Sequence, residues 1–358
     1  VTRSGKESIL EEAAFLRSCV IEVNGKNSGF FHFSTRSRGL NGRNSRFSNM
    51  LCKECSPLQL RRGGARLVRS ESFTGETFTV AWQGAHGKLV YMKIATWNVN
   101  SIRARADRIE DWLDKTEVDV LALQETKTKD ETFPFELFEF LGYEVAHYGL
   151  NQWNGVAIAS RVGLDSVERT FPNQPAFGKP GDSAEVEARA IGATCNGVRI
   201  WSLYVPNGRG LTDPHMAYKM EWMRQLRTNV NGWLHADPAA QFALVGDWNV
   251  APEDTDVWDI DFFRENDLTH VSAPEREAFY ALLNDEGLID PVRPYTQGEY
   301  TYWDYQAGRF SKNEGMRIDF QLCSPALAAR VENAWIDREE REGDGASDHT
   351  PVVIELAD

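Results

Sequence analysis

From residue 92 onward, the chain is built from short apolar stretches that each run into polar side chains. The stretches expected to form strands are Lys93–Asn98, Val118–Gln124, Val156–Ser160, Arg199–Val205, Phe242–Gly246, Ile318–Leu322 and Val352–Leu356. Between them, apolar residues recur at helical spacing, which predicts helices over Ser101–Lys115, Pro214–His235, Glu275–Asp285 and Pro325–Val331. Such alternation of strands and helices is typical of an α/β fold. No apolar run approaches the roughly 20 residues that span a bilayer, so we expect no membrane segment.

Carboxylates and amides gather at the C-terminal ends of the predicted strands. Asn98 ends the first strand and Glu125 follows the second, while Asp247, Asn249 and Asp319 lie at later strand ends. Strand ends along one rim of a sheet are where α/β proteins build their sites. Carboxylate and amide oxygens are hard ligands, which suit Mg²⁺ or Mn²⁺ better than zinc. We therefore expect a site for one of these ions at the rim.

The remaining motifs favour hydrolysis of a phosphate ester. Asp247 and Asn249 are two residues apart and face the same side of an extended chain, so one could act on a water molecule while the other holds it or the phosphate. Asp348 and His349 offer a carboxylate for a metal and an imidazole for a phosphoryl oxygen. The sequence contains no GxSxG motif, no Walker loop and no HExxH motif, which disfavours serine hydrolases, nucleotide-driven transfer and zinc peptidases.

Charge divides the chain near residue 92. Residues 1–91 carry 14 basic and 7 acidic residues, whereas residues 92–358 carry 25 basic and 46 acidic residues, within a net charge of -14. The first segment is rich in Ser, Gly and Arg and lacks a sustained hydrophobic period. Its single CxxC, Cys52 to Cys55, has neither a second pair nor a nearby His, and chance explains it better than a zinc or redox site. We expect residues 1–91 to be a disordered basic extension or a start-site artefact, and residues 92–358 to be the catalytic domain.

The cysteines and the N-terminal residues indicate in which cellular compartment the protein is expected. The five cysteines are irregularly spaced, and charged residues interrupt every apolar patch before a signal peptide could form. We therefore expect a cytoplasmic protein. The overall negative charge argues weakly against a polyanionic partner, although one face can still be basic.

From Met92 to the C-terminus the sequence resembles the exonuclease III family of AP endonucleases, within the larger endonuclease/exonuclease/phosphatase superfamily. The resemblance rests on motifs in the family's order: Trp97-Asn-Val-Asn-Ser-Ile-Arg103, Leu123-Gln-Glu-Thr-Lys127, Leu203-Tyr-Val-Pro-Asn-Gly208, Gly246-Asp-Trp-Asn-Val-Ala-Pro252, Tyr300-Thr-Tyr-Trp-Asp-Tyr305, Met316-Arg-Ile-Asp319 and Ser347-Asp-His-Thr-Pro351. It implies a four-layer α/β sandwich of two mixed sheets flanked by helices. It also implies Mg²⁺-dependent cleavage of DNA 5′ to abasic sites, with 3′→5′ exonuclease and 3′-phosphatase activity. The implied partner is double-stranded DNA with abasic sites or 3′ ends, bound by a monomer.

The resemblance also implies a role for each matching residue. Glu125 is the principal Mg²⁺ ligand, and the residues at or near the metal are Asn98, Glu125, Asp247, Asn249, Asp348 and His349. The residues implied in catalysis are Tyr204, Asp247, Asn249, Asp319 and His349, with Asp247 activating water and Asp319 orienting His349. The residues implied in DNA binding are Arg103, Lys127, Asn207, Tyr302, Trp303 and His349, with the two aromatics beside an abasic sugar. Met316 departs from some relatives in that pocket.

Several alternatives stay open at this stage. The chain could be a superfamily phosphatase for a small phosphoester, or a DNA-binding relative without catalysis, although an inactive relative would be expected to have lost at least one key carboxylate or His349. A secreted DNase-like enzyme is disfavoured by the missing signal peptide and disulfides. Taken singly, Asp319 could be a structural carboxylate and Tyr302 and Trp303 plain core residues, and we expect His270 to be structural or exposed.

Overall fold

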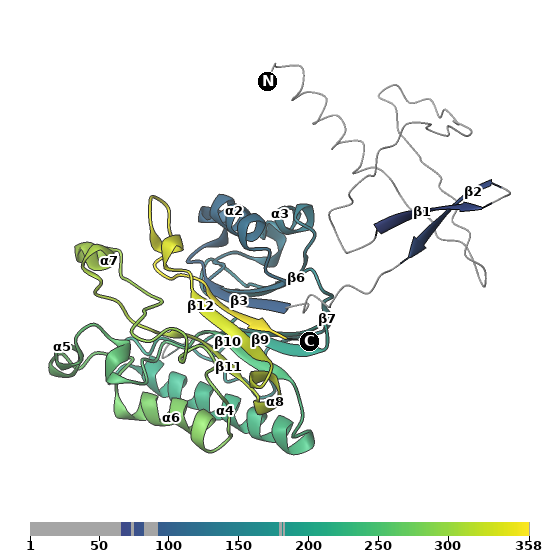
Figure 1. The fold of residues 1–358 in the computed structure, drawn as a ribbon. Helices are drawn as coiled ribbons and strands as arrows, with labels where there is room; N and C mark the ends of the chain where they lie inside the picture. Colours follow the sequence, from purple (N-terminus) through teal and green to yellow (C-terminus); the bar gives the residue numbers. More distant parts are fainter. Residues whose placement is uncertain (1–65, 73–74, 82–91, 179–180, 182, 358) are drawn as a thin grey trace. The chain divides into compact units, whose positions relative to one another are not determined.

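The computed structural model describes residues 66–72, 75–81, 92–178, 181 and 183–357 (Figure 1). The chain divides into two units, Val1–His86 and Gly87–Asp358. In the first unit, β1 (Arg66–Ser72) and β2 (Gly75–Ala81) pair as an antiparallel hairpin. From the sequence, no strand is expected over these residues, because charged residues interrupt the apolar alternation. The hairpin is a correction to that expectation.

Most of the predicted N-terminal extension lies outside the described residues, including the CxxC of Cys52 and Cys55. Its disorder therefore stays a prediction. The same holds for its separation from a catalytic domain at residue 92.

The second unit contains two mixed sheets. One has six strands in the order β12-β13-β3-β4-β6-β5, and the other has five in the order β11-β10-β9-β8-β7. The strand bounds are β3 Met92–Asn98, β4 Val120–Gln124, β5 Glu144–Tyr148, β6 Val156–Ser160, β7 Asp165–Arg169, β8 Ala190–Cys195, β9 Val198–Tyr204, β10 Phe242–Asp247, β11 Asp319–Cys323, β12 Val331–Ile336 and β13 Val352–Leu356. In each sheet one central pair is parallel, β3 with β4 and β9 with β10, and the other neighbours are antiparallel. Parallel neighbours bring their C-terminal ends to the same edge of a sheet.

Helices cover the outer face of each sheet. Their bounds are α2 Ala106–Thr116, α3 Phe135–Phe140, α4 Pro214–Ala236, α5 Ile260–Glu265, α6 Ala273–Asn284, α7 Arg309–Lys312 and α8 Pro325–Ala328. Figure 1 shows α2 and α3 beyond the six-stranded sheet and α4 and α6 beyond the five-stranded sheet. The predicted four-layer sandwich of two mixed sheets flanked by helices is thus confirmed. Within the described part of the chain, no helix has both the length and the apolar character needed to cross a membrane.

The layers follow from the two-residue period of the strands. Ile94 of β3 and Val245 of β10 belong to the core between the sheets. Trp97 of β3 points the other way and meets Trp112 of α2 edge-on, with ring centroids 5.6 Å apart. Leu244 of β10 likewise belongs to the core beneath α4 and α6. Both faces of these strands are therefore buried, which explains why their sequences are almost continuously apolar.

One predicted helix is broken in the structure. The expected helix Ser101–Lys115 consists of a 3-10 turn at Ile102–Ala104 and of α2, which begins at Ala106. The break lies at Arg105, whose φ of -120° and ψ of 9° are not helical. By contrast, Ser272 and Glu275 form the capping box at the start of α6, which agrees with the predicted start of that helix.

Candidate active site

The site lies where the two parallel strand pairs end. Asn98 is the last residue of β3 and Glu125 follows β4, while Tyr204 ends β9 and Asp247 ends β10. Asn98 connects the two sheets, because its Nδ2 donates to Glu125 Oε1 at 2.9 Å and to Asp247 Oδ2 at 2.9 Å. The side-chain amide of Asn98 thereby fixes both carboxylates, and all of its protons are used in doing so.

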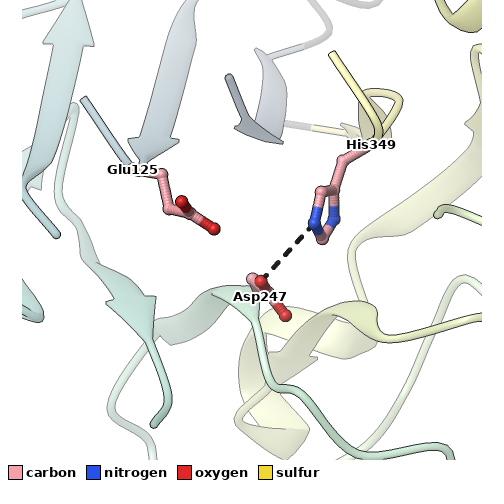
Figure 2. Close-up of side chains that lie close together, drawn as sticks. All are labelled: Glu125, Asp247 and His349. Atoms are coloured by element: carbon pink, nitrogen blue, oxygen red, sulfur yellow. Dashed lines mark ion pairs between the residues drawn. The ribbon is translucent and has the colours of Figure 1, made fainter. Parts of the chain in front are cut away.

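Glu125, Asp247 and His349 form the centre of the site (Figure 2). One potential ligand atom from each lies within 4.8 Å of those of the other two. His349 Nε2 is 3.7 Å from Asp247 Oδ2. The three side chains come from sequence segments more than 100 residues apart, so only the fold brings them together.

Asp319 orients His349 from the opposite side of the imidazole. His349 Nδ1 lies 2.8 Å from Asp319 Oδ2, and both residues are buried. Burial alone would lower the pKa of His349, but the charges of Asp319 and Asp247 outweigh it and raise that pKa to about 10. At neutral pH the ring is therefore an imidazolium, in which Nδ1 donates to Asp319 and the Nε2 proton is directed into the site, 3.7 Å from Asp247 Oδ2.

The two central carboxylates have opposite pKa shifts. Burial raises the pKa of Asp247 to about 7, and the opposing charge of His349 only partly offsets the burial and the repulsion from Asp319 and Glu125. Burial also raises the pKa of Glu125, but the ammonium of Lys127 and the hydrogen bonds of Asn98 and Lys127 bring it below its usual value. Lys127 Nζ lies 2.7 Å from Glu125 Oε2. Glu125 is thus ionised at neutral pH, whereas Asp247, with a pKa of about 7, can either hold or release its proton.

The backbone at the site is unusual. Glu125 and Asn249 both have a φ of 50°, in the left-handed region that side chains other than Gly seldom adopt. Gly246, in β10, has a φ of 146°, and a Cβ atom there would lie 1.9 Å from the carbonyl oxygen of Leu203 in β9. Only a glycine permits this close approach of the two strands directly before Asp247.

Asn249 is held by several hydrogen bonds. Its backbone N–H donates to Asp247 Oδ1 at 2.9 Å, and its Nδ2 donates to the carbonyl of Val205 at 2.9 Å. Its Oδ1 accepts from Asn207 Nδ2 at 3.0 Å. Within the described residues, one N–H of Asn249 Nδ2 therefore remains available for a substrate oxygen. Asn207 itself is exposed beside the site.

The side chain of Tyr204 is close to the guanidinium of Arg189 and to the carboxylate of Glu125. The guanidinium of Arg189 lies over the Tyr204 ring, 4.7 Å from its centroid. Burial and the carboxylate of Glu125 raise the pKa of the Tyr204 hydroxyl well above its ordinary value, and Arg189 only partly counters them. The phenol therefore stays protonated and can act as a hydrogen-bond donor.

Asp348 lies apart from the central group. Its Oδ1 accepts from Asn100 Nδ2 at 3.0 Å, and among the described residues the three-membered cluster does not include it. The resemblance implies that Asp348 lies near the metal, and this stays a prediction; the structure shows its contact with Asn100 in the loop that follows β3.

The predicted aromatic pair is split by the fold. Tyr302 is partly exposed, and its ring meets His349 edge-on with centroids 4.9 Å apart. Trp303 is completely buried, with its ring against Phe310 and its Nε1 donating to Asn313 Oδ1 at 3.3 Å. The expectation that Trp303 stacks beside a sugar is therefore wrong for this conformation, because adjacent residues of an extended segment face opposite sides.

Three cavities lie in this region of the molecule, and one of them is lined by Glu125 of the central group. The largest, of about 610 Å³, is lined by residues that include Glu125, Tyr204, Arg209 and Trp153. A second, of about 410 Å³, shares Trp153 with the first and has a basic lining that includes Arg103, Lys127 and Lys129. The predicted DNA-binding residues Arg103 and Lys127 thus lie on one continuous stretch of surface.

A third cavity, of about 240 Å³, has both aromatic and polar residues in its lining. Its lining includes Tyr302, Met316, Trp258 and Phe262, together with His270. It is the concave surface next to the exposed face of Tyr302.

Sequence reasoning missed some residues of the site. His270 Nε2 lies 3.2 Å from both Asn249 Oδ1 and Asn207 Nδ2, although we expected it to be structural or exposed. Arg189 beneath Tyr204 and the exposed Trp153 were also missed. None of these three lies in a motif that the sequence analysis singled out, so no sequence signal pointed to them.

Comparisons with known proteins agree with this geometry. A sequence profile described as the endonuclease/exonuclease/phosphatase family matches residues 95–349. The exodeoxyribonuclease III of Haemophilus influenzae is 31% identical over 74% of this chain and 100% of its own length. The structure of a variant of the Neisseria 3′ phosphatase NExo, bound to a product DNA hairpin, has a TM-score of 0.67 and 35% identity over 74% of this chain and 99% of that one. An AP endonuclease from Archaeoglobus fulgidus has a TM-score of 0.65 and 33% identity over 75% of this chain and 99% of that one.

Two mixed sheets flanked by helices, with a cluster of carboxylates and a histidine where their parallel strands end, are the arrangement that these comparisons match. The chain belongs to the endonuclease/exonuclease/phosphatase family, and within it to the exonuclease III and AP endonuclease group.

Proposed function

We propose that this protein is a metal-dependent DNA-repair phosphodiesterase, which cleaves DNA 5′ to abasic sites and removes nucleotides and phosphates from 3′ ends. The observation that carries the proposal is the convergence of Glu125, Asp247 and His349 within 4.8 Å. The names of the relatives support the substrate class, since they include an exodeoxyribonuclease III, a 3′ phosphatase bound to product DNA and an AP endonuclease.

The residues present fit a divalent cation. Burial raises the pKa of Asp247, and the nearby carboxylates of Asp319 and Glu125 raise it further, so three acidic groups lie close together in the site. Oxygen ligands of this kind suit Mg²⁺, and Glu125 and Asp247 would hold it while Asn98 fixes their orientation. When bound, the ion supplies Lewis-acid polarisation of the phosphate and neutralises charge on the leaving oxygen.

His349 and Asp319 act on the phosphate from the other side. The protonated ring donates from Nδ1 to Asp319, which leaves its Nε2 proton for a phosphoryl oxygen. Negative charge increases on that oxygen as the attacking oxygen adds, so the donor stabilises the transition state more than the ground state. Asp319 keeps the ring charged and correctly turned.

Asp247 and Asn249 serve the attacking water. Asp247, which Asn98 holds in place, can accept the proton of the water as it attacks phosphorus. Asn249 is fixed relative to Asp247 by its backbone hydrogen bond, and its remaining Nδ2 proton can orient the water or the phosphate. The protonated hydroxyl of Tyr204 adds a donor next to Glu125.

The surface around the site fits DNA rather than a small ester. The two cavities that share Trp153 extend from Glu125 to Arg103, Lys129 and Arg209, which offers positive charge for backbone phosphates and an exposed indole for stacking. A small sugar phosphate would leave most of this surface unused. The size and charge of the surface thus support a polymeric substrate.

A panel of substrates tests the proposal. The protein would be incubated with a duplex bearing an internal abasic-site analogue, with a duplex ending in a 3′-phosphate, and with a free sugar phosphate. Each reaction is run with Mg²⁺, with Mn²⁺ and with EDTA. We expect hydrolysis of both duplexes only with a divalent ion, and negligible release from the sugar phosphate. Preferential hydrolysis of the sugar phosphate would contradict the proposal, and so would DNA binding without any cleavage.

A further inference from the structure

A completely buried ion pair lies behind Asn249. Lys219 of α4 and Glu275 of α6 form a salt bridge in which both side chains have 0% exposure. Removing two charges from water is costly, and such a pair is retained only when further hydrogen bonds satisfy it. The partners of this pair therefore indicate what it holds in place.

Lys219 holds the backbone of the site. Its Nζ donates to the carbonyl oxygen of Asn249 at 2.6 Å and to that of Asn207 at 3.4 Å, besides its bond to Glu275. An ammonium has three protons, so each of them has an acceptor here. Two of the three acceptors belong to the residues that lie beside the reacting groups, and Asn249 is the residue with the left-handed backbone.

Glu275 holds the other side of the same residue. Its Oε1 accepts from the backbone N–H of His270 at 3.0 Å, and its Oε2 accepts from the hydroxyl of Ser272 at 2.5 Å. His270 Nε2 in turn lies 3.2 Å from Asn249 Oδ1. The ion pair thus contacts the backbone of Asn249 through Lys219 and its side chain through His270.

We infer that Lys219 and Glu275 are positioning residues that set the orientation of Asn249 for the attack on phosphate. Trp248 already anchors the segment, since its buried ring meets Phe279 of α6 edge-on at 5.4 Å. That contact fixes the residue before Asn249, and the N–H of Ala251 after it donates to the carbonyl of His270 at 2.8 Å. The carbonyl of Asn249 itself is held by Lys219, and without that bond the peptide after Asn249 is less constrained against rotation. Lys219 supplies the hydrogen bond that opposes this rotation. The inference rests on the proposed function, because it assigns the pair to hydrolysis at the same site.

The test compares two ion pairs that involve the same helix. The variant Lys219→Met/Glu275→Gln removes both charges, so no uncompensated charge stays buried, and Gln keeps an acceptor for His270. The control on the same helix is Arg227→Met, which breaks a partly exposed pair with Glu286, where Arg227 Nε lies 2.7 Å from Glu286 Oε1. This control pair contacts no residue of the site.

Three measurements are made on the full chain. Steady-state kinetics on the 3′-phosphate duplex with Mg²⁺ gives kcat and KM, and thermal unfolding gives Tm. Hydrogen exchange of the Asn249 amide in EDTA reports the local order without any reaction. We expect the double variant to lose about 10- to 100-fold in kcat with KM changed less than threefold, and to exchange that amide at least about tenfold faster. Arg227→Met should lower Tm while leaving kcat and the exchange unchanged.

The outcomes separate this inference from the proposed function. A double variant that keeps kcat within threefold overturns the inference while the function stands, and the pair is then purely structural. If the wild-type protein hydrolyses none of the substrates, the proposed function fails instead. Unchanged exchange at Asn249 in the double variant also overturns the inference, whatever the kinetics show.

Discussion

Replacing Gly246 with alanine should inactivate the protein through a movement of about 1 Å. The added Cβ atom would lie 1.9 Å from the carbonyl oxygen of Leu203, whereas such atoms in proteins essentially never approach closer than 3.0 Å. Because the neighbouring atom is backbone, β10 and β9 would have to separate by at least about 1 Å. Asp247 follows directly and its carboxylate is fixed by Asn98 at 2.9 Å, so the displacement acts on the general base.

A displacement of about 1 Å at a reacting group costs on the order of 10²-fold in rate. The strained strand pair should also lower the free energy of unfolding by at least about 3 kcal/mol. The control is Gly142→Ala, since Gly142 has a φ of 83° and nothing within 4 Å of its Cβ position. That variant should cost only the conformational penalty of about 1–2 kcal/mol and keep full activity.

The steric reasoning is tested by measuring urea unfolding and kcat on the 3′-phosphate duplex for both glycine variants. If Gly246→Ala unfolds at the same urea concentration as Gly142→Ala and turns over at the wild-type rate, the steric reasoning is refuted. Loss of stability with normal turnover would refute the claim that the strand separation displaces the carboxylate of Asp247.

Three further variants test other parts of the structure. Asp247→Asn should lower kcat by at least ~10²-fold while DNA binding in EDTA changes only a few-fold, and near-normal turnover would remove Asp247 as the base. Trp303→Ala should lower the free energy of unfolding by about 3–5 kcal/mol, because its ring is fully buried, with substrate preference unchanged; altered preference at an unchanged Tm would argue for a DNA contact instead. Burial lowers the pKa of His147 to about 4. Between roughly pH 6.5 and 4, the unfolded chain therefore takes up a proton that the folded state does not. The free energy of unfolding should fall by up to about 3 kcal/mol over this range. In His147→Gln this loss should shrink, as measured by urea unfolding against pH, whereas an equally steep loss would point to other groups.

Most of the strands with both faces buried were predicted from the sequence, although β8 was not. Apolar runs such as Val156–Ser160 and Val352–Leu356 coincide with β6 and β13, because both faces meet other layers of the fold. The edge strand β7, Asp165–Arg169, was not predicted, since all of its side chains are exposed and it has no apolar pattern. The helix break at Arg105 was also missed, because the sequence around it keeps a helical spacing.

For the site, motifs identified the residues but not their surroundings. Glu125, Asp247 and His349 were each visible at a strand end, and the fold brings them together. The contact of His270 with Asn249 could not be predicted, since it depends on where the loop before α6 meets the end of β10. For Trp303, the expectation was wrong in the other direction. It was expected to lie on the same surface as its neighbour Tyr302, but its side chain points into the core.

The pairing of β3 with β13 has a consequence for how activity arises during synthesis. These two strands come from opposite ends of the second unit, and their register runs from Met92 with Leu356 to Thr96 with Val352. A growing chain that still lacks β13 leaves one side of β3 unpaired, even though Asn98 and Glu125 were made long before. Contacts between such distant segments form late and slowly. The complete site should therefore assemble only as folding finishes, so partly made chains should lack the proposed activity.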